Sequence, residues 1–204
     1  MKKNVSKKVT NMRARPSRKE AEQAVKTLIK WAGDNPEREG LLETPKRVVN
    51  AYTEFFSGYH EKPEQILSKT FDEVEGYDEM VIVRDISIES HCEHHMVPFI
   101  GIAHIGYIPN QRVVGISKLA RIADVFAKRL QTQETMTAQI ADTINEVLRP
   151  KGVAVVIDAQ HQCMTTRGTH KTESSTITSR MLGLFRTNSN TRNEFMNLIG
   201  SAKK

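Results

Sequence analysis

Two short segments of the chain hold residue types that commonly bind metals. The stretch "SHCEHHMVPF", residues 90–99, contains Cys92 together with three histidines, and "HQCMTTRG", residues 161–168, contains Cys163 beside a histidine. Thiolate and imidazole are preferred zinc ligands, and Cys92 and His95 are close enough for one tight turn to present both. We therefore predict a metal site formed by Cys92, His95 and Cys163.

The spacing leaves the type of metal site open. Three protein ligands leave one coordination position free, as in catalytic zinc sites, whereas a fourth ligand closes a structural site. Either His94 or His161 could supply that fourth ligand. A lone cysteine can also be a small buried hydrophobic residue, but both cysteines of this chain lie beside histidines, which favours metal binding. Ferrous iron is an alternative to zinc, because it can also occupy a Cys₂His site.

Groups that could transfer protons or contact a purine lie near the same segments. His94 and His161 are candidates for proton transfer, because imidazole titrates near neutral pH. The segment "QTQET", residues 131–135, offers Gln133 and Glu134. A carboxylate can accept two N–H bonds from the edge of a guanine, although most glutamates are simply solvated.

Several basic residues could together hold a polyanionic ligand. The segment "GISKLAR", residues 115–121, places Ser117, Lys118 and Arg121 at the predicted start of a helix, where backbone N–H groups also favour anions. Arg167 follows Cys163 by four residues. A triphosphate needs several such cations, because one exposed ion pair is weak. Taken singly, Lys118 and Arg121 fit a solvated helix face better than a phosphate site.

Composition restricts the class of protein. With 204 residues, of which 38% are hydrophobic and 26% charged, the chain is expected to form one globular domain with an appended helical segment. No apolar run approaches the roughly 20 residues that cross a bilayer, and the basic start lacks the apolar core of a secretory signal. Two cysteines suit metal binding better than a disulfide. We therefore expect a cytoplasmic protein without a membrane partner.

The positive charge raises the alternative of a zinc-stabilised nucleic-acid-binding module. The net charge is +6 and the sequence pI is about 9.3, with part of the excess in a predicted disordered tail over residues 1–17. However, the two cysteines lie about 70 residues apart rather than in a finger pattern, and aromatic residues, at 6%, offer few rings for stacking on bases. We therefore expect no nucleic-acid partner.

Hydrophobic periodicity predicts the elements that position these residues. Ser17 and Glu20 have the spacing of a capping box, and Pro45 suits the first position of a second helix after Thr44. Residues 59–78 are interpreted as an irregular connection. Strands in runs rather than in strict alternation with helices favour an α+β fold with an antiparallel sheet. The predicted helices cover residues 17–36, 43–59, 117–130, 137–148 and 191–200, and the predicted strands cover 79–90, 98–109, 112–117, 152–161 and 174–182.

Taken together, the motifs resemble those of the GTP cyclohydrolase I family over about residues 18–199. They are "ETPKRV", "EMVIVRDI", "CEHHMVPFIGIAHIGYIP", "GISKLARI", "RLQTQE", "HQCMTTRG", "SSTITS" and "TRNEF". The resemblance implies a tunnelling-type fold (T-fold): a four-stranded antiparallel sheet with two helices on one face, after an N-terminal helical segment. It implies a catalytic domain over residues 79–204, a helical segment over 18–78, and a homodecamer of two stacked pentamers with active sites between subunits.

The resemblance also implies a reaction and a role for each site residue. Water on zinc attacks C8 of the guanine of GTP, formate is released, and the product rearranges to 7,8-dihydroneopterin triphosphate, the first step of tetrahydrofolate or pterin synthesis. A relative that handles another pterin or a deazaguanine is the remaining alternative. The implied assignments are Cys92, His95 and Cys163 as zinc ligands, His161 as the acid that protonates N7, His94 and Ser117 at the sugar, Glu134 with Gln133 at the guanine, and Arg47, Lys118, Arg121 and Arg167 at the triphosphate.

Overall fold

The computed structural model of the chain describes residues 15–68, 70–71 and 77–200. These fall into two compact units that divide between Thr53 and Glu54. The division lies earlier in the chain than the boundary expected after residue 78, so the three-part domain organisation stays a prediction. Most of the predicted basic tail lies outside the described residues. No helix among the described residues is both long enough and apolar enough to cross a bilayer.

The N-terminal unit is helical. Helix α1 (Arg18–Trp31) begins with the predicted capping box, in which the Ser17 backbone N–H donates to Glu20 at 2.7 Å and the Ser17 hydroxyl accepts from the Glu20 backbone N–H at 3.3 Å. A short 3₁₀ helix, η1 (Glu39–Leu41), leads to α2 (Thr44–Phe55), whose last residues belong to the second unit. The structure counts Thr44 as the first residue of α2 rather than its cap, a difference within the usual uncertainty of helix ends.

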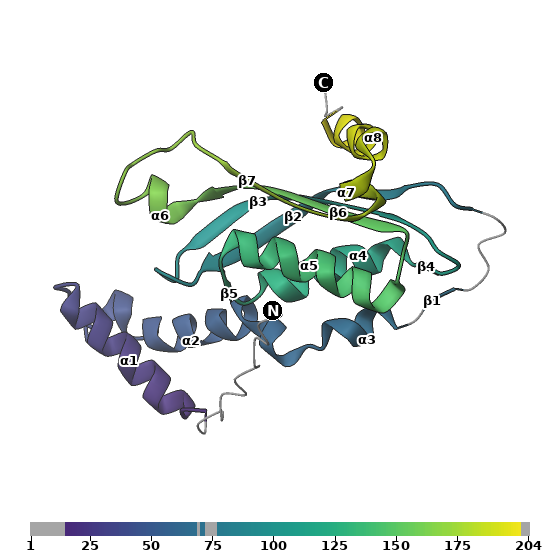
Figure 1. Cartoon of the computed structure of the whole chain (residues 1–204). Coiled ribbons are helices and arrows are strands. Elements are labelled where there is room, and N and C mark those ends of the chain that lie inside the picture. The colour runs from purple at the N-terminus through teal and green to yellow at the C-terminus, as the bar shows by residue number, and fades with distance from the viewer. Residues whose placement is uncertain (1–14, 69, 72–76, 201–204) are drawn as a thin grey trace, which may run out of the picture. The chain divides into compact units, whose positions relative to one another are not determined.

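The second unit contains the sheet and its helices (Figure 1). Each strand expected from residue 79 onward forms, with ends shifted by a few residues. The connection predicted to be irregular is partly helical, because it buries the fully enclosed Leu67. The elements are η2 (Ser57–His60), α3 (Pro63–Leu67), β1 (Thr70–Phe71), β2 (Val81–Cys92), β3 (Pro98–Ile108), β4 (Val113–Val114), α4 (Ile116–Ala127), β5 (Leu130–Gln131), α5 (Gln133–Leu148), β6 (Gly152–His161), α6 (Gln162–Thr165), β7 (Thr176–Gly183), α7 (Leu184–Thr187) and α8 (Ser189–Gly200).

The main sheet has the strand order β5-β2-β3-β6-β7. Its four long strands are antiparallel, as expected for an α+β fold. The expected sheet had four strands, and the structure adds the two-residue β5, which pairs in parallel with the end of β2 through His91 and Cys92. Strands β1 and β4 form a separate antiparallel pair. The short β5 lacks the length that a sequence pattern needs to predict a strand.

Helices cover both faces of the sheet. In β6, Val153, Val155 and Ile157 pack into the larger core with α4 and α5, whereas Ala154 and Val156 pack toward Phe185 and Phe195. The sequence of a strand that is buried on both faces is a nearly continuous run of apolar residues, and residues 152–157 have this pattern. Figure 1 shows α4 and α5 on one face, as predicted, and α7 and α8 on the other.

Strands β3 and β6 approach closely near the end of the sheet that carries the cysteines. Their register pairs Phe99 with His161 and Gly101 with Ala159. A Cβ added at Gly101 would overlap the carbonyl oxygen of Asp158 and lie 2.7 Å from the Cβ of Ala159. Real Cβ atoms essentially never come this close to another atom. The missing side chain of Gly101 therefore permits the pairing that places His161 beside Phe99.

Candidate active site

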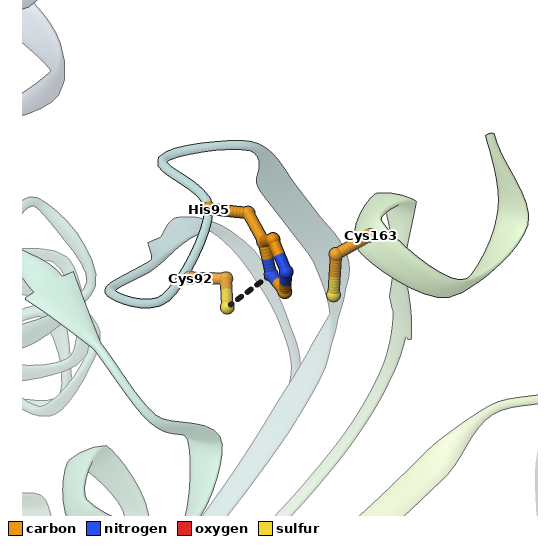
Figure 2. Close-up of side chains that lie close together, drawn as sticks. All are labelled: Cys92, His95 and Cys163. Carbon is orange, nitrogen blue, oxygen red and sulfur yellow. Dashed lines mark hydrogen bonds between the residues drawn. The ribbon is translucent and has the colours of Figure 1, made fainter. Parts of the chain in front are cut away.

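Three potential metal ligands meet where β2, β3 and β6 end or begin (Figure 2). Cys92 is the last residue of β2, His95 lies in the turn that follows, and Cys163 lies in α6 directly after β6. The ligand atoms of the three side chains all lie within 4.8 Å of one another. The sheet register explains this meeting, because pairing Phe99 with His161 brings the end of β6 beside the start of β3.

The turn between β2 and β3 sets the relative position of Cys92 and His95. The backbone carbonyl of Cys92 accepts hydrogen bonds from the N–H groups of His95 at 3.4 Å and Met96 at 2.8 Å. The backbone N–H of Cys92 donates to the carbonyl oxygen of Val97 at 2.9 Å. Met96 adopts a positive φ of 55°, which lets the chain reverse. The Cys92 Sγ then lies 3.9 Å from His95 Nδ1.

These dimensions and donor types suit a divalent metal. Two thiolates and one imidazole are a donor set that zinc favours, and a tetrahedral zinc with its usual bond lengths holds such atoms roughly 3.5–3.8 Å apart. The observed spread of up to 4.8 Å is close to that value. Burial raises the pKa of the Cys163 thiol, and the neighbouring Cys92 raises it further. A bound cation would offset this resistance to ionisation, because metal coordination deprotonates a thiol.

Neither histidine considered as a fourth ligand joins this group. Among the described residues, the cluster within metal-binding distance consists of Cys92, His95 and Cys163. The His94 side chain is 65% exposed, with Nδ1 3.7 Å from the Cys92 sulfur and Nε2 3.9 Å from Glu93. The Nε2 of His161 lies 2.8 Å from Oε1 of Gln133. The arrangement therefore leaves a coordination position open to water or a ligand.

His161 is a partly buried imidazole beside the cluster. Its ring stacks on Phe99 with centroids 4.7 Å apart and planes 8° from parallel. Burial lowers the pKa of His161, and the carboxylate of Glu134 opposes that shift. The ring is thus held in one plane and is mainly neutral near pH 7, a state from which it can gain and return a proton.

A cavity of about 220 Å³ joins these groups. Its lining includes the three candidate metal ligands together with His94, His161 and Glu134. Glu134 lies in the first turn of α5, which Thr132 caps by accepting from the Thr135 N–H at 3.2 Å. Arg167 also reaches the cluster, with a guanidinium nitrogen 3.1 Å from His95 Nε2. A single cavity therefore offers a metal site, two histidines, a carboxylate and a nearby guanidinium.

The residues predicted on α4 are not brought to this cavity. Strand β3 leads away from the cluster for about 30 Å at the usual rise per residue, and α4 begins only after β4. Ser117 and Lys118 occupy the first turn of α4, and neither they nor Arg121 lines the cavity. The Lys118 ammonium instead donates to the Ile66 carbonyl at 2.9 Å. Arg47 lies on α2 in the N-terminal unit.

Two residues have roles that the sequence did not indicate. Phe99 lies in a predicted strand, and its stacking on His161 depends on the β3–β6 register. Gln133 is expected at the guanine. The residue lines the cavity but is only 1% exposed, and its side-chain amide is bonded to protein groups, so its contact with the guanine stays a prediction. The place of Gln133 near the predicted start of a helix was the one available signal.

Comparison with known proteins gives consistent matches along most of the chain. The family model described as "GTP cyclohydrolase I" matches residues 21–200. Three curated relatives carry the name "GTP cyclohydrolase 1". The relative from Hyphomonas neptunium is 61% identical over 186 residues, covering 91% of this chain and 90% of its own. That from Maricaulis maris is 58% identical over 188 residues, covering 92% of each chain. That from Brucella suis is 58% identical over 191 residues, covering 94% of this chain and 90% of its own.

A solved structure also aligns with part of the chain. It is described as the archaeosine synthase QueF-Like in the apo form, and it is 14% identical with a TM-score of 0.41. The alignment covers 51% of this chain and 93% of that one.

Proposed function

Because the chain belongs to the GTP cyclohydrolase I family, we propose that it hydrolyses the guanine ring of GTP at C8, releases formate and forms 7,8-dihydroneopterin triphosphate. This would be the first step of pterin or tetrahydrofolate synthesis. The observation that carries the proposal is the convergence of Cys92, His95 and Cys163 with His161 in one cavity. A hydrolytic centre needs both an activated water and a proton donor, and this cavity has residues suited to each.

We propose zinc as the metal held by Cys92, His95 and Cys163. When bound, zinc would lower the pKa of a coordinated water enough to supply a nucleophile at neutral pH. Two thiolates favour zinc among the common divalent metals, and ferrous iron is the competing occupant of such a donor set. The protein's contribution is to present the three donors from two strand ends and to keep a position open on the cavity side.

The other cavity residues would bind and protonate the substrate. His161, held flat against Phe99, would donate a proton to N7 of the guanine and make C8 more electrophilic. The carboxylate of Glu134 can accept two N–H bonds from the guanine edge. His94, exposed at the cavity, suits the sugar. Arg167 would turn from His95 toward the triphosphate, because a guanidinium binds phosphate oxygens in bidentate fashion.

The remaining phosphate and sugar residues would come from another subunit. The cavity of about 220 Å³ is smaller than the roughly 300–1,000 Å³ of typical ligand sites, and Ser117, Lys118 and Arg121 lie outside it. We propose that the chain forms a homo-oligomer, a decamer of two stacked pentamers. In it, α4 and Arg47 of neighbouring copies would complete each site. The long edge strand β7 supports this proposal, because an unpaired strand edge readily accepts another strand.

We also propose that the protein is cytoplasmic. Both cysteines are free thiols, and a reducing compartment keeps them available as metal ligands.

Product analysis tests the proposed reaction directly. Purified protein is incubated with GTP before and after removal of metal by a chelator, and formate and the oxidised fluorescent pterin are measured. We expect both products in equal amounts from the zinc-loaded protein and neither after chelation. Zinc-loaded protein that binds GTP but yields no formate would contradict the proposal.

Substitution of one ligand tests the metal assignment. Cys163→Ser should lower both the zinc content and the turnover at least tenfold, because the serine hydroxyl is a poor zinc ligand at neutral pH. Exposed Ser174, changed to Ala, is a matched control that should leave both quantities near wild type. Normal zinc content in Cys163→Ser would show that the ligands are assigned wrongly.

A further inference from the structure

The amide of Gln133 has one orientation that its surroundings permit. Its Nε2 lies 3.0 Å from the carbonyl oxygen of Ile157, 2.8 Å from that of Thr176 and 3.1 Å from the hydroxyl of Thr178. Carbonyl oxygens only accept hydrogen bonds, so the group that faces them must be the NH₂. Reversing the amide would press its oxygen against two carbonyl oxygens. The contacts themselves therefore settle which end of the amide faces His161.

The fixed orientation determines which nitrogen of His161 carries hydrogen. The Oε1 of Gln133 lies 2.8 Å from His161 Nε2, and an amide oxygen can only accept. His161 must therefore donate from Nε2. In the neutral ring the lone pair is then on Nδ1, which leaves Nδ1 as the nitrogen that exchanges a proton with a ligand in the cavity.

The support around this pair leaves little freedom. Gln133 is 1% exposed, and Phe99, which stacks on the His161 ring, is fully buried. The Thr137 hydroxyl donates to the backbone carbonyl of Gln133 at 2.7 Å and lies 2.7 Å from the Thr178 hydroxyl. The stack fixes the plane of the imidazole, and the amide fixes its rotation within that plane. Buried polar groups that are fully bonded in this way hold one arrangement.

We propose that Gln133 is a positioning residue that holds His161 as the Nε2–H tautomer, so that proton transfer to the substrate occurs through Nδ1. The inference rests on the proposed function of His161. The charged ring would give its Nδ1 proton to N7 of the guanine and keep its Nε2 proton, which stays hydrogen-bonded to Oε1 of Gln133. The neutral ring would then regain a proton at Nδ1 from water. The amide bond to Nε2 is unchanged throughout, so the ring keeps its position during transfer.

Spectroscopy of labelled histidines tests the tautomer without requiring turnover. The zinc-loaded protein is prepared with ¹⁵N-histidine, and the signals of His161 among the seven histidines are identified by comparison with His161→Gln. We expect wild-type neutral His161 to carry hydrogen on Nε2. Hydrogen on Nδ1 would overturn the proposal. The measurement of the tautomer does not require turnover. A protein that failed to release formate would therefore refute the proposed function without changing the tautomer measured for His161.

Two variants separate positioning of His161 from substrate binding and from general packing. Gln133→Met has a similar shape but cannot bond Nε2, so the Nδ1–H tautomer should become populated and kcat should fall by about 10- to 100-fold, with little change in KM. Thr178→Val removes one acceptor of the same network but leaves the Gln133–His161 bond, and kcat should fall by no more than about threefold.

The kinetic outcomes distinguish the two roles of Gln133. A raised KM with normal kcat in Gln133→Met would mean that the side chain binds substrate, and would overturn the proposal. Equal losses of kcat in the two variants would mean that the network is only structural, and would also overturn it. If Gln133→Met does not fold, the wild-type spectrum alone still decides the tautomer.

Discussion

The close approach of β3 and β6 at Gly101 is predicted to limit both stability and metal binding. In Gly101→Ala the new Cβ would overlap the Asp158 carbonyl oxygen and lie 2.5 Å from the Cα and 2.7 Å from the Cβ of Ala159. Ordinary contacts of a Cβ begin near 3.4 Å, so relief of the two Ala159 contacts alone requires the strands to separate by 0.7–0.9 Å, and relief of the Asp158 overlap requires more. Backbone atoms cannot rotate away as the end of a flexible side chain can.

The cost follows from two effects. Forcing a methyl group into a packed site costs about 1–3 kcal/mol, and weakening two ladder hydrogen bonds adds about 1 kcal/mol each. A loss of roughly 3–5 kcal/mol corresponds to a fall in Tm of about 10 °C for a chain of this size. The same separation moves Cys163, which follows β6, away from Cys92 at the end of β2. Zinc should therefore be lost to a competing chelator at a lower chelator concentration.

Thermal unfolding and chelator titration at one protomer concentration measure both effects. Gly115→Ala is the matched control, because a Cβ at Gly115 meets nothing within 4 Å. Its Tm should stay within about 3 °C of wild type, because two effects on stability nearly cancel. Alanine is a poorer N-cap of α4 than glycine and lowers stability, whereas it also restricts the unfolded chain and thereby raises stability. If Gly101→Ala unfolds at the same temperature as Gly115→Ala and retains zinc equally well, the explanation given for the strand contact is wrong.

Two further predictions concern residues outside the cavity. Burial lowers the pKa of His104, whose Nδ1 accepts from the Asp85 N–H at 3.2 Å, although the Asp85 carboxylate partly opposes the shift. As the pH falls, His104 is therefore protonated in the unfolded chain before it is protonated in the folded protein. The contribution of neutral His104 to the free energy of unfolding is complete above about pH 6.5 and decreases below that pH. Urea unfolding at pH 7.5 and 5.5 should show a smaller decrease in His104→Gln, and an equal decrease in both proteins would contradict this. Lys118→Met removes the bond to the Ile66 carbonyl, so it should lower the free energy of unfolding by about 1 kcal/mol and raise KM for GTP, whereas an unchanged KM would exclude Lys118 from the triphosphate site.

The sequence predicted the parts of the site that depend on residue type and local spacing. Cys92 and His95 are three residues apart, so one turn suffices to join them, and the structure forms that turn. The prediction of Cys163 as the third metal ligand depended on its thiol chemistry and on its place after a buried strand. The helices and long strands were predictable for a similar reason, because their hydrophobic period repeats over ten or more residues.

What the sequence could not predict depends on pairing between distant segments. The stacking of Phe99 on His161 and the enclosure of Gln133 follow from strand register and from the packing of α5 on β6 and β7. No local pattern encodes a register between strands that are separated by two helices. The placement of Ser117 away from the cavity has a similar origin, because residue types at a helix start do not reveal which end of the sheet that helix approaches.

The pairing of β3 with β6 also bears on how the chain avoids an incorrect fold. A slip of one residue would exchange the two faces of β6, and because both faces of this strand are apolar, hydrophobicity alone opposes such a slip only weakly. A slip of two residues keeps every side chain on its own face, so burial alone permits it. Such a slip would move Cys163 by roughly 6.6 Å along the sheet, farther than the 4.8 Å within which the three ligand atoms lie. It would also leave Gly101 opposite a different residue and bring a side chain into the space that only glycine fits. The glycine contact and the meeting of the three candidate metal ligands therefore both favour the native register over an alternative that hydrophobicity would accept.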